Sequence, residues 1–281
     1  MAWIAACKNQ SGRWSRVLPR QSEGWHTVTN TAYRVNMARR YRFRRPVLAQ
    51  APKSCDFGHR ADESGLDYLG DHEEGNCSKR AGMRTWAHNS YVRAWTEFLK
   101  QCHFQDVVAK VHDWDYTERP NTDRRVPDIR ATSPCGRITY IIDARIAWNL
   151  STSGISTYDT TGALARAGEV TKRKSWASAL ARQAPFATTA VVFVPLSCEI
   201  SGAWGPATER FFNDAIDYIN NERDIDFFHW SSVRMSEFWR TSFDVTLASQ
   251  RARVGTAAAE GDWRKTVQQY GLAEAEALAR G

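Results

Sequence analysis

The chain has 281 residues, 42% of them hydrophobic, with twelve tryptophans and a formal net charge of +7. This composition is ample for a hydrophobic core. No run approaches the roughly 20 apolar residues of a membrane span, and the start, MAWIAACKNQ, is too short an apolar stretch for a secretory signal. The six cysteines are spread irregularly, unlike the framework of a small secreted domain. We therefore expect an intracellular, reduced protein without a membrane partner.

The positive charge is concentrated near the N-terminus. Residues 1–50 hold ten Lys or Arg side chains and one acid, Glu23. The densest cluster, ARRYRFRRP, interleaves two aromatic residues with arginines, a pattern suited to phosphate pairing and base stacking. We expect residues 1–54 to form a basic extension that contacts nucleic acid; a solvated helix end is the alternative. The candidate binding residues are Arg39, Arg40, Arg42, Arg44 and Arg45.

Residues 55–83 form a Gly- and Asp-rich stretch without sustained helical or strand periodicity. A structural Zn²⁺ would explain how such a segment is ordered without a core. The candidate ligands are Cys55, His59, His72 and Cys77, but Pro52 occupies the position that a Cys-x2-Cys opening would need. The pattern indicates either a degenerate zinc site or a set of unrelated thiols.

From Arg84 the pattern predicts a helix with one buried face. Aromatic and aliphatic residues recur at spacings of three to five, as a single apolar stripe requires. These residues are Trp86, Tyr91, Trp95, Phe98 and Leu99. The next segment, VVAKVHDWDY, alternates like a strand, with Val107, Ala109 and Val111 on one face.

Two β-branched runs, residues 126–131 and 138–146, follow a turn-forming stretch and are joined by SPCGR, whose Pro and Gly suit a hairpin turn. Each run carries one aspartate, Asp128 or Asp143. A charge on a central strand costs several kcal/mol unless it is paired or binds a metal. In a hairpin the two carboxylates can lie near each other, where Mg²⁺ would offset their repulsion. Exposed strand ends or salt bridges to arginines are the alternative.

Further elements follow the hairpin. Residues 161–183 have the composition of a helix, TTAVVFVPLSCEI is an apolar strand, and SGAWGP is a turn that leads into an amphipathic helix. The order predicts an α/β fold in which helices flank a mixed β-sheet. We assign residues 84–222 to this domain and residues 223–281 to a C-terminal helical tail.

The combination of Pro127-Asp128, a 14-residue interval and Asp143-Ala144-Arg145, with a helix on either side, resembles the PD-(D/E)XK nuclease superfamily, whose fold is restriction-endonuclease-like. A more specific likeness covers most of the chain. The ordered set RRYRFRRPVLA, GDHEEGNC, the PD and IDAR strands, ARAGEVTKRK and FVPLSCEISGAWGPA resembles the nuclease-like region downstream of reverse transcriptase in certain eukaryotic non-LTR retroelements.

The resemblance implies roles for particular residues. Asp128 and Asp143 would bind Mg²⁺ or Mn²⁺. The usual lysine position holds Arg145, a good phosphate clamp and a poor base. Lys172 on the following helix would replace that lysine, and Lys174 is the second choice.

Three further residues are open. Glu169 is either an added metal ligand or a surface partner of Lys172 or Arg173. Glu118 is either an ordinary loop acid or the acid that the family often carries before the first aspartate strand. His88 is either a helix-surface histidine or a residue that contacts DNA phosphate or caps the active site.

The resemblance implies a metal-dependent endonuclease that nicks DNA, with RNA as a second possible partner, beside a reverse transcriptase module and in a nuclear location. Two alternatives stay open. One is an inactive nuclease-like module that binds nucleic acid, which Arg145 favours. The other is a decayed retroelement remnant, to which the incomplete Cys/His set points.

Overall fold

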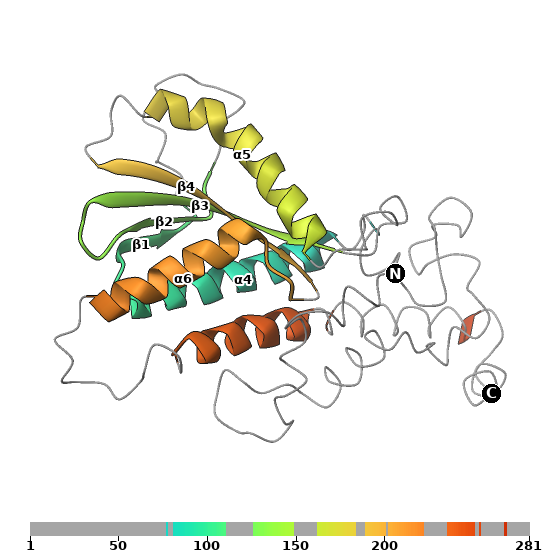
Figure 1. Cartoon of the computed structure of the whole chain (residues 1–281). Coiled ribbons are helices and arrows are strands. Elements are labelled where there is room, and N and C mark those ends of the chain that lie inside the picture. The colour runs from blue at the N-terminus through green and yellow to red at the C-terminus, as the bar shows by residue number, and fades with distance from the viewer. Residues whose placement is uncertain are drawn as a thin grey trace.

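The computed structural model describes residues 77, 81–110, 126–148, 162–183, 189–200, 202–221, 235–250, 253 and 267–268. Within these residues the chain forms an α/β arrangement in which helices cover both faces of a four-stranded sheet (Figure 1). The coarse fold class expected from the sequence is confirmed. No helix among the described residues is long and apolar enough to span a membrane.

The first described helix, α4, spans Ala81–Gln101. Its apolar stripe is buried as the spacing predicts, since Tyr91, Trp95, Phe98 and Leu99 are fully covered. Trp86 is the exception, because it is 43% exposed and lies under the guanidinium of Arg253, 3.8 Å from the ring centroid. The prediction that Trp86 belongs to the buried stripe was therefore wrong.

The sheet has the order β1-β2-β3-β4. Strands β1 (Gln105–Ala109), β2 (Ile129–Thr132) and β3 (Ile138–Ala147) are antiparallel neighbours, whereas β4 (Ala190–Glu199) runs parallel to β3. The β2–β3 hairpin expected about SPCGR is confirmed. Gly136 adopts a φ of 72° in this turn, a conformation that glycine tolerates without strain.

Strand β1 differs from the prediction. It begins at Gln105 and ends at Ala109, and Lys110 then takes a φ of 57°, which breaks the extended backbone. Ala109 is exposed, and only Val107 packs partly against the core, so the expected buried face is absent from this strand. The remainder of the predicted strand, residues 111–116, lies outside the described residues.

Helix α5 (Ala163–Gln183) connects the parallel strands β3 and β4 and covers one face of the sheet. Helices α4 and α6 (Pro206–Asn221) cover the other face (Figure 1). Helical elements predicted at residues 161–183 and after the Gly-Pro turn are both present. A parallel pair needs such a crossover, because the chain must return to the same end of the sheet before it can form the next strand.

The main hydrophobic core lies between the sheet and the α4/α6 layer. Trp95 is its centre, with its ring against Phe98, Phe211, Phe212 and Phe243. Phe243 belongs to a further helix, residues 235–250, which also contributes to this core. This part of the expected C-terminal tail is thus packed on the domain.

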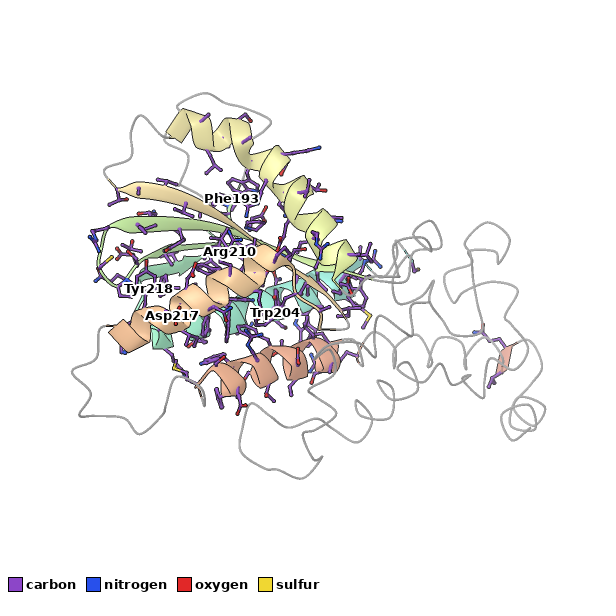
Figure 2. All side chains as sticks on the ribbon, viewed as in Figure 1. Phe193, Trp204, Arg210, Asp217 and Tyr218 are labelled. Atoms are coloured by element: carbon purple, nitrogen blue, oxygen red, sulfur yellow. The ribbon has the colours of Figure 1, made fainter. Side chains whose placement is uncertain are left out.

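A smaller hydrophobic cluster lies under α5 and contains Ile141, Trp176 and Ala179, with Phe193 packed against it. Figure 2 shows Phe193 on the α5 side of the sheet and Trp204 on the side of α4 and α6. The two faces of the sheet are therefore packed by separate sets of side chains.

Candidate functional site

The strand register brings the two predicted aspartates together. The last paired residues at this end of the hairpin are Ile129 and Ile142, so Asp128, which directly precedes β2, and Asp143, which directly follows Ile142, lie close together. The Asp128 N–H donates to the Ile142 carbonyl at 2.9 Å, so the backbone of Asp128 bonds to Ile142 and not to Asp143. The two carboxyl groups interact through their side chains. The expectation that a hairpin places them side by side is met.

Asp143 points toward α5. Side chains alternate along a strand, so its neighbours Ile142 and Ala144 face the main core on the opposite side. Two residues of α5 reach its Oδ2 atom: Lys172 Nζ lies 2.8 Å away, and Trp176 Nε1 donates at 2.5 Å. These residues are four apart and therefore share one helix face. Asp143 is only 7% exposed, so these two donors supply the polar partners that a buried carboxylate requires.

Asp128 is held from the other layer. Its Oδ2 accepts the Ala144 N–H at 2.7 Å and lies 3.2 Å from Nε2 of His88, a residue of α4. The same His88 nitrogen is 3.3 Å from the Ala144 carbonyl oxygen. The interpretation of His88 as an ordinary helix-surface histidine was wrong, because this side chain turns toward the aspartate pair and is largely covered.

The charges in this cluster change one another's proton affinity. Burial raises the pKa of Asp143 and Asp128 adds to this effect, while Lys172 acts in the opposite direction. Burial also acts to raise the pKa of Asp128, but the contacts with His88 and the Ala144 N–H outweigh this effect, so the pKa of Asp128 is lowered. The hydrogen bond to Asp128 raises the pKa of His88, against the effect of burial. Asp128 is thus the more acidic member of the pair.

Arg145 lies two residues beyond Asp143 and on the same face of β3. A Cβ atom added to Gly168 of α5 would lie 3.2 Å from Arg145 Cδ and 2.4 Å from Ser197 Oγ. The absence of a side chain at Gly168 therefore lets α5 approach the sheet closely enough for Lys172 and Trp176 to contact Asp143. The aliphatic part of Arg145 passes beneath this glycine.

Glu169 does not join the aspartate cluster. Its carboxylate is buried and accepts hydrogen bonds from the backbone N–H groups of Ala207 at 2.9 Å and Thr208 at 3.1 Å. These are unpaired amides of the first turn of α6, where a negative charge is favourable. Both sequence interpretations, an added metal ligand and a surface partner of Lys172 or Arg173, were wrong because α6 begins directly beside this face of α5.

Several predicted site residues lie outside the described residues. They are Glu118, the arginines Arg39, Arg40, Arg42, Arg44 and Arg45, and the zinc candidates Cys55, His59 and His72. The fourth zinc candidate, Cys77, is buried, is not part of a disulfide, and its carbonyl accepts a hydrogen bond from Arg84.

The sequence interpretation missed Trp176. The helical spacing could have indicated it, because Trp176 follows Lys172 by four residues and therefore lies on the same face of the helix. Trp204, in the Gly-rich turn before α6, packs against Trp95 and Phe212 in the main core. Its ring therefore serves the fold.

The aspartate cluster offers hard oxygen donors on two adjacent backbone segments. Within the parts of the chain that the structure describes, no group of three or more His, Cys, Asp or Glu side chains is arranged to hold a metal ion. Two neighbouring carboxylates nevertheless suit Mg²⁺, because this ion is commonly bound by one or two carboxylates and completes its shell with water and substrate phosphate. The two carboxylates therefore match the ligand chemistry of Mg²⁺ or Mn²⁺.

No protein-family model matches this chain, and no curated protein matches it either.

Proposed function

We propose that this chain carries a divalent-metal-dependent endonuclease domain of retroelement origin, which nicks DNA by hydrolysing a phosphodiester bond. The observation that carries the proposal is the position of Lys172, whose Nζ is 2.8 Å from Asp143 Oδ2 while Asp128 lies beside Asp143. An acid pair on a hairpin and a lysine from the following helix converge although 44 residues separate Asp128 from Lys172. This convergence supports the role of relocated lysine that the sequence resemblance implies for Lys172.

The topology supports the finer fold assignment, a restriction-endonuclease-like domain of the PD-(D/E)XK superfamily. A helix precedes three antiparallel strands, and a crossover helix leads to a fourth, parallel strand followed by another helix. In this arrangement the acids come from the hairpin and the lysine from the crossover helix. The order of elements is the one that the resemblance to this superfamily implies.

The residues of the cluster would divide the work. Asp128 and Asp143 would hold Mg²⁺ or Mn²⁺, which when bound lowers the pKa of a coordinated water and offsets the charge of the phosphate. Lys172, which is ion-paired with Asp143, would orient the attacking water or the phosphate. Arg145 would clamp the scissile phosphate with its planar guanidinium.

The charge of α5 supports nucleic acid as the partner. The helix contains five basic residues and one acid, and the acid is Glu169, which is buried against α6. Arg166, Arg173 and Lys174 are exposed on it. Helix α6, on the other face of the sheet, contains three acids and one arginine. A polyanion would therefore be drawn to the side of the sheet on which Lys172 lies. A reverse transcriptase module and a nuclear location belong to the same proposal.

One observation favours a second function, an inactive nuclease-like module that binds nucleic acid. Arg145 stands where the superfamily usually has its lysine, and a guanidinium cannot act as a base near neutral pH. This alternative retains the basic surface and predicts salt-sensitive binding without cleavage.

The proposal is tested by nicking of supercoiled plasmid in Mg²⁺ or Mn²⁺. We expect the wild type to nick, and Asp143→Asn and Lys172→Met to lose at least about 100-fold in rate, a loss typical of positioned acid–base and metal-binding groups. Lys174→Met is the matched control, because it removes the same charge from an exposed position two residues along the same helix.

The outcomes separate the two functions. A wild type that binds DNA but cuts it with neither metal supports the binding module. Equal nicking by the Lys172 and Lys174 variants rejects the role given to Lys172. Both variants should be checked for folding by circular dichroism, because Lys172 compensates a buried carboxylate and its loss leaves Asp143 with one fewer partner.

A further inference from the structure

Trp176 is placed to control the geometry of Asp143. Its indole Nε1 donates to Asp143 Oδ2 at 2.5 Å, the same oxygen atom that Lys172 contacts. Asp128 shows the same feature, because both the Ala144 N–H and His88 meet its Oδ2. Within the described residues, these contacts all meet the Oδ2 atom of each carboxylate. Oδ1 of each carboxylate carries none of these four contacts.

The indole is itself held in place. Trp176 is 1% exposed and its ring stacks on Phe193 with a centroid distance of 5.2 Å and an angle of 24° between the planes. Ile141 and Ala179 complete the surrounding cluster. A ring buried on this scale has little rotameric freedom, so the direction of its N–H is set by packing.

The two donors on Asp143 differ chemically. Lys172 has a flexible four-carbon stem and a positive charge, which repels an incoming cation. The Trp176 N–H is neutral and cannot accept a hydrogen bond, so it fixes the carboxylate without opposing a metal ion. Lys172 is also free to move toward a phosphate, because Trp176 still satisfies Oδ2 when the lysine leaves.

We infer that Trp176 is a positioning residue, which holds the Asp143 carboxylate in the orientation that binds the divalent cation while Lys172 engages the substrate. This inference rests on the proposed metal function. Partners of ligating carboxylates typically contribute 10- to 100-fold to metal affinity or activity. Trp176 contacts neither the metal nor the substrate in this arrangement and acts through Asp143.

The test compares two tryptophan substitutions. Trp176→Phe keeps the aromatic stack and removes the donor. Trp239→Phe is the matched control, because Trp239 is also a buried tryptophan, 2% exposed, and also donates its Nε1 to a side-chain oxygen, that of Gln101 at 3.1 Å. We expect the Mn²⁺ dissociation constant of the full chain, measured by calorimetry, to rise about 10- to 100-fold in Trp176→Phe and to stay unchanged in Trp239→Phe.

A second measurement needs neither metal nor activity. The indole N–H signal of Trp176 is identified in ¹⁵N-tryptophan-labelled protein as the signal that Trp176→Phe removes. The chemical shift of this signal should differ between wild type and Asp143→Asn, because the substitution weakens the charge-assisted hydrogen bond. The Trp239 signal should not move in the same variant.

The combined outcomes decide the inference. Equal Mn²⁺ affinities for the two tryptophan variants overturn it, as does a Trp176 indole signal that ignores Asp143→Asn. A wild type that binds no Mn²⁺ overturns the metal function and with it the positioning role. In that case the indole signal still tests whether Trp176 holds the Asp143 carboxylate. A loss of nicking with normal Mn²⁺ affinity in Trp176→Phe would also contradict the inference.

Discussion

The two faces of the sheet are packed by different chemistry. On the α4/α6 side, aromatic rings fill the space, and Trp95 alone contacts four phenylalanines. On the α5 side, a small apolar cluster borders a carboxylate, a lysine and an arginine. Burial of apolar area is the main source of stability, while buried charges cost free energy unless they are paired. One face therefore stabilises the domain, and the other carries the groups capable of chemistry.

His88 and Asp128 connect the two faces. His88 comes from α4, yet it contacts the aspartate beside Asp143, which in turn contacts Lys172 of α5. The cluster thus spans the sheet at the start of β2. The position of these side chains requires both helical layers to be folded. We therefore predict that substitutions in the aromatic layer affect the site only by destabilising the folded domain.

The largest effect is expected from Trp95→Ala. Removal of a buried tryptophan from the centre of the aromatic layer should lower the free energy of unfolding by about 3–5 kcal/mol. Trp86→Ala is the matched control on the same helix, because Trp86 is 43% exposed and, among the described residues, its ring has a cation–π contact with Arg253, worth about 0.5–1 kcal/mol. Urea denaturation measures both. Similar losses in the two variants would show that the aromatic layer is not the main source of stability.

A smaller effect is expected from Glu169→Gln. The substitution keeps the shape of the side chain but weakens charge-assisted hydrogen bonds to the first turn of α6, for an expected loss of about 1–3 kcal/mol in stability. Thermal unfolding measures the loss. Nicking by the folded variant should be unchanged, because Glu169 binds backbone amides. A folded variant that cannot nick would show that Glu169 takes part in the nicking reaction.

The smallest expected effect is a difference in reactivity between two cysteines, Cys135 and Cys102. Cys135 lies exposed in the β2–β3 turn, where hydrogen bonds with Ser133 and Arg137 lower the pKa of its thiol to about 7. Burial raises the pKa of Cys102, which lies in the aromatic layer. The thiolate is the nucleophile, so alkylation of Cys135 by iodoacetamide should increase with pH through a midpoint near 7.

Peptide mapping by mass spectrometry separates the two sites. Cys102 should stay unmodified in the folded protein over the same pH range and react only after urea is added, when the Cys135 midpoint should also rise toward its ordinary value. Rapid labelling of Cys102 without urea would mean that the aromatic layer opens readily, and the contrast between the two faces would then be weaker than the packing suggests.

The sequence by itself determined the elements whose signals are local. The stripe at Tyr91, Trp95 and Phe98 predicts a buried helix because helical periodicity places these residues on one face. The SPCGR turn between two β-branched runs predicts the hairpin, and the hairpin alone is enough to bring Asp128 and Asp143 together. Lys172 was also within reach of sequence reasoning, through the resemblance and its place on the next helix.

Tertiary structure alone decided which face of each helix meets which part of the sheet. In the folded domain His88 contacts Asp128, and Trp176 donates to Asp143. Glu169 binds the first turn of α6, and Trp86 is exposed at the surface. Helical spacing shows which side chains share a face, but not what that face contacts. The contacts depend on the crossover of α5 and on close approaches such as the one Gly168 permits, and these join residues far apart in the chain.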